Sequence, residues 1–96
     1  MVIVTGSAVI QPDRIDDAIA VSLEHVRRSR TEPGCLSHAV HRDVENPLRL
    51  VFVEQWADLD VLHTHFQVPA SGAFVEALGA MSTGRSTMEI YQAEPA

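Results

Sequence analysis

The spacing of apolar and polar residues changes period several times along the chain. Residues 2–10 are rich in Val and Ile and are followed by turn-forming residues, which predicts a first strand. Two further strand-like runs, residues 35–43 and 49–56, are separated by the turn sequence VENP, which predicts a β-hairpin. The sequence STGRSTMEIYQA, residues 82–93, predicts a last strand.

Two other segments carry apolar residues at helical spacing. The first opens at Pro12 and ends near Arg30, with acids at its start and arginines at its end, as the helix dipole favours. The second follows Trp56, with Asp58 as its expected N-cap, and resumes at Pro69. The predicted order, β-α-β-β-α-β, is that of a ferredoxin-like α+β fold with an antiparallel sheet. The expected helical stripes are Ile15, Ala18, Ile19, Ser22 and Val26, then Phe74, Leu78 and Met81.

The predicted sheet is apolar on both faces. Successive strand residues point to opposite sides, so Leu50 and Phe52 face one way while Val51 and Val53 face the other. The helical segments can cover only one face, and soluble monomers rarely expose an apolar patch above a few hundred Å². We therefore expect a homodimer whose two sheets pack face to face, a dimeric α/β barrel.

Composition narrows the classes of function. The 96 residues predict one domain, residues 1–96, with 46% apolar residues, 21% charged residues and a formal net charge of -6. Basic residues gather only at Arg27, Arg28 and Arg30, so we expect no nucleic-acid partner. The start lacks the pattern of a signal peptide and no long apolar run is present, so we expect a cytoplasmic protein without a membrane partner. Cys35 is the single cysteine and is expected to be a small buried residue of a strand.

Histidine spacing argues against a metal site. His63 and His65 are about 200° apart around a helix, and His38 and His41 lie on opposite faces of a strand. We therefore expect no metal, and the dispersed glycines predict no nucleotide-binding loop. His63 is expected in solvent. The residues assigned to the surface, an interface or packing are His25, His41 and Tyr91.

The hairpin predicts a pocket on the helix-facing side of the sheet. The segment after Trp56 folds over this face and is expected to bring His65 or Phe66 near the indole. Aromatic walls with one or two imidazoles and a carboxylate suit a planar aromatic ligand. Purely structural roles stay open for Trp56 in packing, for His65 bonded to a carbonyl and for Glu54 as an ion-pair partner. The predicted cross-strand pairs are His38 with Glu54, Val40 with Phe52, and Leu36 with Trp56.

Several short motifs follow one another in a fixed order. EPGC at residues 32–35 opens the second predicted strand, RD at residues 42–43 precedes the turn, EQW at residues 54–56 ends the third strand, and His65 follows eleven residues after that glutamate. This set closely resembles the antibiotic biosynthesis monooxygenase (ABM) family, and the similarity covers roughly residues 2–92.

The chain departs from the family pattern at three places. Residues 68–71 are VPAS where family members often have S-P-H-F, and His38 stands where a tyrosine is common. The first strand also lacks the asparagine that haem-degrading relatives use. These departures place a titratable group in the predicted cleft and make a haem ligand less expected.

The resemblance implies a cofactor-independent monooxygenase that oxidises a small aromatic or quinol-type substrate with O₂. An ionised hydroxyarene can itself donate an electron to O₂, so the protein needs only to bind it, remove a proton and exclude water. An imidazole suits proton removal near neutral pH. The predicted base is His65 or His38, and Trp56 would stack on the ring or donate its N–H to the developing oxyanion. The predicted substrate-binding residues are Trp56, Glu54, Phe52, Phe66 and Phe74.

Three alternatives stay open on the same fold. One is a haem-binding or haem-degrading protein. The second is a non-catalytic small-molecule carrier or sensor, and the third is an isomerase of small metabolites.

Overall fold

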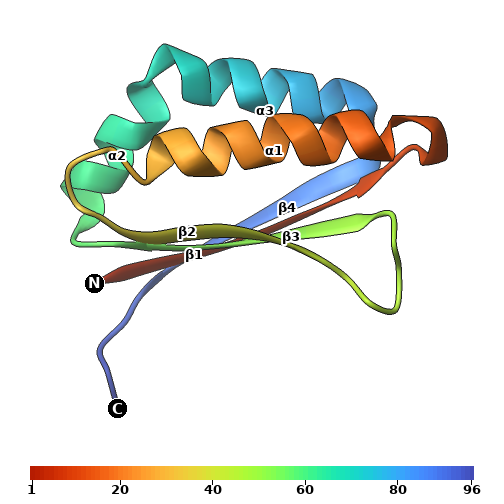
Figure 1. Ribbon diagram of the computed structural model, residues 1–96. Helices are drawn as coiled ribbons and strands as arrows, with labels where there is room; N and C mark the ends of the chain where they lie inside the picture. The colour runs from red at the N-terminus through yellow and green to blue at the C-terminus, as the bar shows by residue number, and fades with distance from the viewer.

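A computed structural model describes all residues of the chain, Met1–Ala96. The elements are β1 (Val2–Ile10), a 3₁₀ turn η1 (Pro12–Arg14), α1 (Ile15–Ser29), β2 (Cys35–Arg42), β3 (Arg49–Trp56), α2 (Leu59–Gln67), α3 (Pro69–Met81) and β4 (Ser82–Gln92). The four strands form one antiparallel sheet in the order β2-β3-β1-β4, and the helices cover one of its faces (Figure 1). The predicted ferredoxin-like α+β fold is confirmed.

Local sequence signals explain where the helices of the second half begin. Asp58 is the N-cap of α2, as predicted, because its Oδ1 accepts a hydrogen bond of 2.9 Å from the backbone N–H of Val61. The segment then divides into two helices, since Val68 is extended and Pro69 begins α3. This division lets α2 turn over the end of the sheet while α3 runs beside α1 (Figure 1).

The hairpin register is confirmed at its centre and differs at its end. His38 pairs with Glu54, and Val40 pairs with Phe52, as predicted. The predicted pairing of Leu36 with Trp56 is wrong. The register shifts between Cys35 and Ser37, Cys35 takes the place opposite Trp56, and the side chain of Leu36 is 56% exposed. A β-bulge inserts one extra residue into a strand, so a register counted from the turn fails beyond it.

The alternation of buried and half-buried residues along β3 shows which face of the sheet carries the core. Along β3 every second residue is buried and those between are half-buried, as predicted from period two. The buried apolar side chains form two clusters, and the buried polar residues Glu54 and His38 lie between them on the sheet. The larger cluster is Ala8, Ile10, Ala18, Val26, Leu50, Phe52, Leu78 and Met81, and the smaller is Val2, Val4, Trp56 and Leu62.

The sheet face away from the helices is only partly covered within one chain. Ile3, Val51 and Val53 are half-buried there, and Tyr91 on β4 is 48% exposed. A face-to-face homodimer stays a prediction that this face favours. None of the helices is both long and apolar enough to cross a membrane.

Candidate active site

A cavity of about 510 Å³ lies between the sheet and the helices. It receives side chains from α1, α2 and α3 and from all four strands. Most of its wall is apolar, and its titratable side chains gather in one corner, which is the usual composition of a pocket for a small organic ligand. Three further polar residues, Ser7, Ser86 and Thr87, line the cavity elsewhere. The apolar wall includes Val4, Phe52, Phe66, Phe74, Leu78 and Met88. The polar corner is His25, His38, Glu54, His65 and Ser71.

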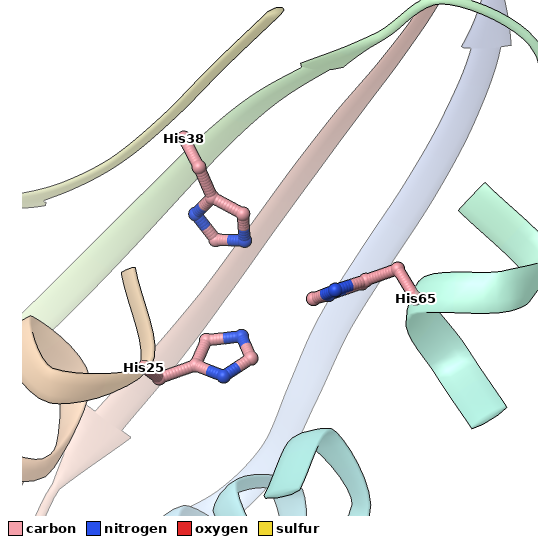
Figure 2. Close-up of side chains that lie close together, drawn as sticks. All are labelled: His25, His38 and His65. Atoms are coloured by element: carbon pink, nitrogen blue, oxygen red, sulfur yellow. The ribbon is translucent and has the colours of Figure 1, made fainter. Parts of the chain in front are cut away.

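Three buried imidazoles converge in the polar corner (Figure 2). His25 comes from α1, His38 from β2 and His65 from α2, and one nitrogen of each ring lies within 4.8 Å of one nitrogen of each other ring. The three side chains are 2–7% exposed. We call this group the histidine triad.

His65 is held by a carboxylate from the loop before β2. Its Nδ1 lies 3.0 Å from both Oε1 and Oε2 of Glu32. Because a carboxylate can only accept a hydrogen bond, Nδ1 carries the proton and Nε2 of the neutral ring is left as an acceptor. An imidazole held in this way through Nδ1 can accept a proton at Nε2.

The EPGC loop brings Glu32 to this position. Gly34 has φ +84°, a conformation that L side chains rarely adopt, and a Cβ built there would lie 2.7 Å from Cγ1 of Val61 on α2. Its carbonyl oxygen also accepts a hydrogen bond of 2.9 Å from the backbone N–H of Ala57. The glycine therefore lets the loop pack tightly against the start of α2, the helix that carries His65.

Arg28 connects several groups of the site from the last turn of α1. Its Nη1 donates to Oε2 of Glu32 at 2.8 Å, and its Nη2 donates to Nδ1 of His25 at 3.1 Å and to Oγ of Ser71 at 3.0 Å. A guanidinium cannot accept, so Nδ1 of His25 is the acceptor. One cation thus fixes both the carboxylate behind His65 and the ring of His25.

His25 is kept neutral by its surroundings. Burial, followed by the charges of His38, His65 and Arg28, lowers the pKa of His25 to about 3, and Glu54 opposes this only in part. The ring also stacks on Phe74, with centroids 3.9 Å apart and planes 4° apart. Packing therefore fixes the plane of the imidazole and electrostatics fixes its charge.

His38 faces the second buried carboxylate of the site. Its Nε2 lies 3.2 Å from Oε1 of Glu54, but the geometry is not that of an aligned hydrogen bond, and both of its ring nitrogens lack one. The indole N–H of Trp56 donates to the same oxygen at 2.9 Å. Burial acts to raise the pKa of Glu54, yet the contacts with His38, Trp56 and His65 outweigh it and lower that pKa below its usual value. Glu54 is therefore a buried carboxylate beside the imidazole of His38, whose two ring nitrogens have no hydrogen-bond partner.

The structure gathers most of the predicted site residues. His38, His65, Glu54, Phe52, Phe66 and Phe74 all line the cavity. Trp56 does not: its side chain is fully buried beside His65, with ring centroids 4.5 Å apart, and its N–H is taken by Glu54. Trp56 therefore cannot stack on a substrate ring in this cavity as expected. Its indole instead donates to Glu54 and packs against the ring of His65.

Three residues of the site, His25, Glu32 and Arg28, were not predicted from the sequence. His25 is buried, so its assignment to the surface, an interface or packing overlooked its place in the cavity. The helical spacing does indicate that His25 is buried, because residue 25 lies seven positions after Ala18 and three after Ser22, on the buried stripe of α1. His63 and His41 are exposed, and His63 is the solvent-facing residue that was predicted.

The histidine triad also corrects the argument from spacing against shared ligands. The spacing excludes a shared ligand only between histidines close in sequence, whereas the tertiary structure joins three that are far apart. Histidines that bind a metal usually donate their other N–H to an acceptor. His65 has such an acceptor in Glu32, but His25 faces the guanidinium of Arg28, a donor and a cation. The surroundings of His25 therefore do not fit a metal ligand.

The profile of the family described as antibiotic biosynthesis monooxygenase matches residues 1–77, most of the chain. The chain belongs to the ABM family. The uncharacterised protein sll1783 of Synechocystis is 31% identical over 91 residues, which cover 95% of this chain and 62% of that protein. The ABM chain described here thus spans less than two thirds of the length of that relative.

Solved structures agree with the family assignment. A crystal structure of an antibiotic biosynthesis monooxygenase is 28% identical, with a TM-score of 0.91, and covers 99% of this chain and 100% of the other. A candidate antibiotic biosynthesis monooxygenase from Deinococcus radiodurans is 25% identical, with a TM-score of 0.95, and covers 100% of this chain and 95% of the other. The ABM fold therefore extends over the whole chain, including β4, which lies beyond the matched profile.

Proposed function

We propose that this ABM protein is a monooxygenase that oxidises a small hydroxylated aromatic compound with O₂ and without a bound cofactor. The observation that carries the proposal is the pair formed by Glu32 and His65 at the wall of a largely apolar cavity. It combines a base of defined orientation with walls that bind an aromatic ring and exclude water.

The cavity offers a binding surface for the ring of such a substrate and a proton acceptor for its hydroxyl group. Phe52, Phe66 and Phe74 supply the flat apolar surface that an aromatic ring requires. A ring hydroxyl directed at the polar corner meets Nε2 of His65, which accepts its proton, and His38 with Glu54 offers a second imidazole beside it. The predicted bases, His65 and His38, both keep a place in the proposal, with His65 as the primary one because only its Nδ1 is bonded to a carboxylate.

The proposed reaction needs no external reductant. His65 takes the hydroxyl proton, and the resulting aryloxide gives one electron to O₂, forming an aryloxyl radical and superoxide. A C–O bond forms between superoxide and a ring carbon, and the imidazolium returns its proton to give a hydroperoxide. Loss of the proton from that carbon then breaks the O–O bond. The ring carbon becomes a carbonyl of a quinone, and the second oxygen atom leaves as water.

The test measures O₂ uptake and ¹⁸O incorporation with a panel of phenols, hydroquinones and anthrones, without flavin and with a chelator present. We expect one labelled oxygen atom in the quinone product and a fall in kcat of at least roughly tenfold in His65→Ala, a threshold set below the roughly 10²- to 10⁴-fold that a general base typically contributes. His63→Ala, at an exposed position of the same helix, is the matched control. Ligand binding with no O₂ uptake above the buffer rate would refute the enzyme and leave a small-molecule carrier. A rate in His65→Ala equal to that of the control would refute the assignment of the base.

A further inference from the structure

We infer that the polar corner selects aromatic ligands with two oxygen atoms on adjacent ring carbons, because it presents a fixed hydrogen-bond donor, Nε2–H of His25, beside a fixed acceptor, Nε2 of His65. The inference deepens the proposed function, since it names the substitution pattern of the ring that binds at the same site.

The tautomer of His25 follows from Arg28. Nη2 of Arg28 lies 3.1 Å from Nδ1 of His25, and arginine has no acceptor atom. Nδ1 must therefore offer its lone pair, and the single proton of the neutral ring lies on Nε2. The second nitrogen of this ring has no hydrogen-bond partner within the chain, which leaves its N–H for a ligand in the cavity that His25 lines.

The ring of His25 is also held as a neutral donor. The groups packed around it are His38, His65, Arg28, Glu54 and the ring of Phe74. Burial lowers its pKa most, and His38, His65 and Arg28 lower it further, so that the pKa of His25 is about 3. Near neutral pH the imidazole therefore donates through Nε2 only.

His65 presents the opposite tautomer. Both oxygens of Glu32 lie 3.0 Å from its Nδ1, and Arg28 holds one of these oxygens at 2.8 Å. In the neutral ring the proton therefore lies on Nδ1, which donates to the carboxylate, and Nε2 is the acceptor. Arg28 thus sets both tautomers, one directly and the other through Glu32.

The spacing of the two rings selects the ligand. The centroids of His25 and His65 are 5.5 Å apart, and the closest nitrogens of the triad lie within 4.8 Å. Two groups this close can both form hydrogen bonds with oxygen atoms on adjacent carbons of one ring. Oxygen atoms at opposite ends of the ring are too far apart to bond to both groups equally well. One hydroxyl donates to His65, and the adjacent oxygen, as hydroxyl or carbonyl, accepts from His25. The donor then also stabilises the oxyanion that forms when His65 removes the proton.

The first test is binding under anaerobic conditions, which separates recognition from turnover. Catechol, hydroquinone, resorcinol and phenol are titrated into the protein and followed by calorimetry. We expect catechol to bind roughly tenfold more tightly than hydroquinone, as one additional hydrogen bond to a buried partner allows. His25→Phe keeps the aromatic stack on Phe74 and should bring the ratio close to one, while His25→Gln, which retains an N–H donor, should keep part of the preference. His63→Phe is the control and should bind like the parent protein.

The second test uses the unmodified protein and does not depend on a folded variant. Long-range ¹⁵N–¹H NMR should show the Nε2–H tautomer of His25, unchanged from about pH 5 to about pH 8, where free imidazole titrates. A proton on Nδ1, or a doubly protonated ring in this range, would overturn the inference. Equal affinity of the parent protein for catechol and hydroquinone would also overturn it. A preference for catechol without O₂ uptake would support the inference and refute the proposed oxygenation, so the two failures are distinguishable.

Discussion

Replacement of Glu32 by Gln tests the orientation of His65 most directly. The substitution keeps the shape of the side chain and removes the charge that accepts the Nδ1 proton. An amide can turn its NH₂ group toward Nδ1, which then becomes the acceptor and moves the ring proton to Nε2. The base is thereby presented to the substrate in the wrong tautomer.

The magnitude follows from the contacts of this pair. The side chains of His65 and Glu32 are only 4% and 15% exposed, so solvent screens their interaction weakly. A hydrogen bond to a charged partner contributes about 1.5–3 kcal/mol, which corresponds to a fall of roughly 10- to 150-fold in kcat at 1.36 kcal/mol per factor of ten. KM should change less, because Glu32 does not line the cavity.

The assay is O₂ uptake across a range of pH. We expect the rate of Glu32→Gln to fall and the pH dependence of kcat to shift, whereas Glu24→Gln, which removes the same charge from an exposed position of α1, should behave like the parent protein. A kcat within about twofold of the parent value and an unchanged pH profile would refute the reasoning, since the lost stabilisation would then be negligible.

Three further results are expected. Gly34→Ala should lower the free energy of unfolding by about 2–4 kcal/mol in urea denaturation, because it adds left-handed strain and a clash with Val61, and a loss no greater than that of Gly79→Ala, which has open space, would contradict this. The depressed pKa of His25 means that the unfolded chain binds its proton first, so stability should fall by a few kcal/mol as pH drops from about 6.5 towards 3. This acid loss should be smaller in His25→Phe, and an identical slope would contradict the assignment. Val53→Glu, on the open sheet face, should convert a dimer into a monomer in size-exclusion chromatography with light scattering, and a monomeric parent protein would contradict the predicted assembly.

The sequence by itself determined the order of elements and the faces of the sheet. Period-two alternation identifies the buried side of β3, and the side chain of Asp58 marks the start of α2, because these signals depend on neighbours a few residues apart. The turn of the hairpin likewise predicts the pairing of His38 with Glu54. Each of these features is encoded locally, so it can be predicted without coordinates.

The tertiary structure alone decided how the site is assembled. His25, His38 and His65 come from three elements, and no periodicity relates positions that meet only when α1 and α2 pack on the sheet. From the sequence, Arg28 can be recognised only as a cation near the end of a helix. In the folded protein its guanidinium donates hydrogen bonds to Glu32, His25 and Ser71. The tautomers, and with them the chemistry proposed for the cavity, follow from these distant contacts, because a hydrogen bond depends on distance and direction in space and not on separation along the chain.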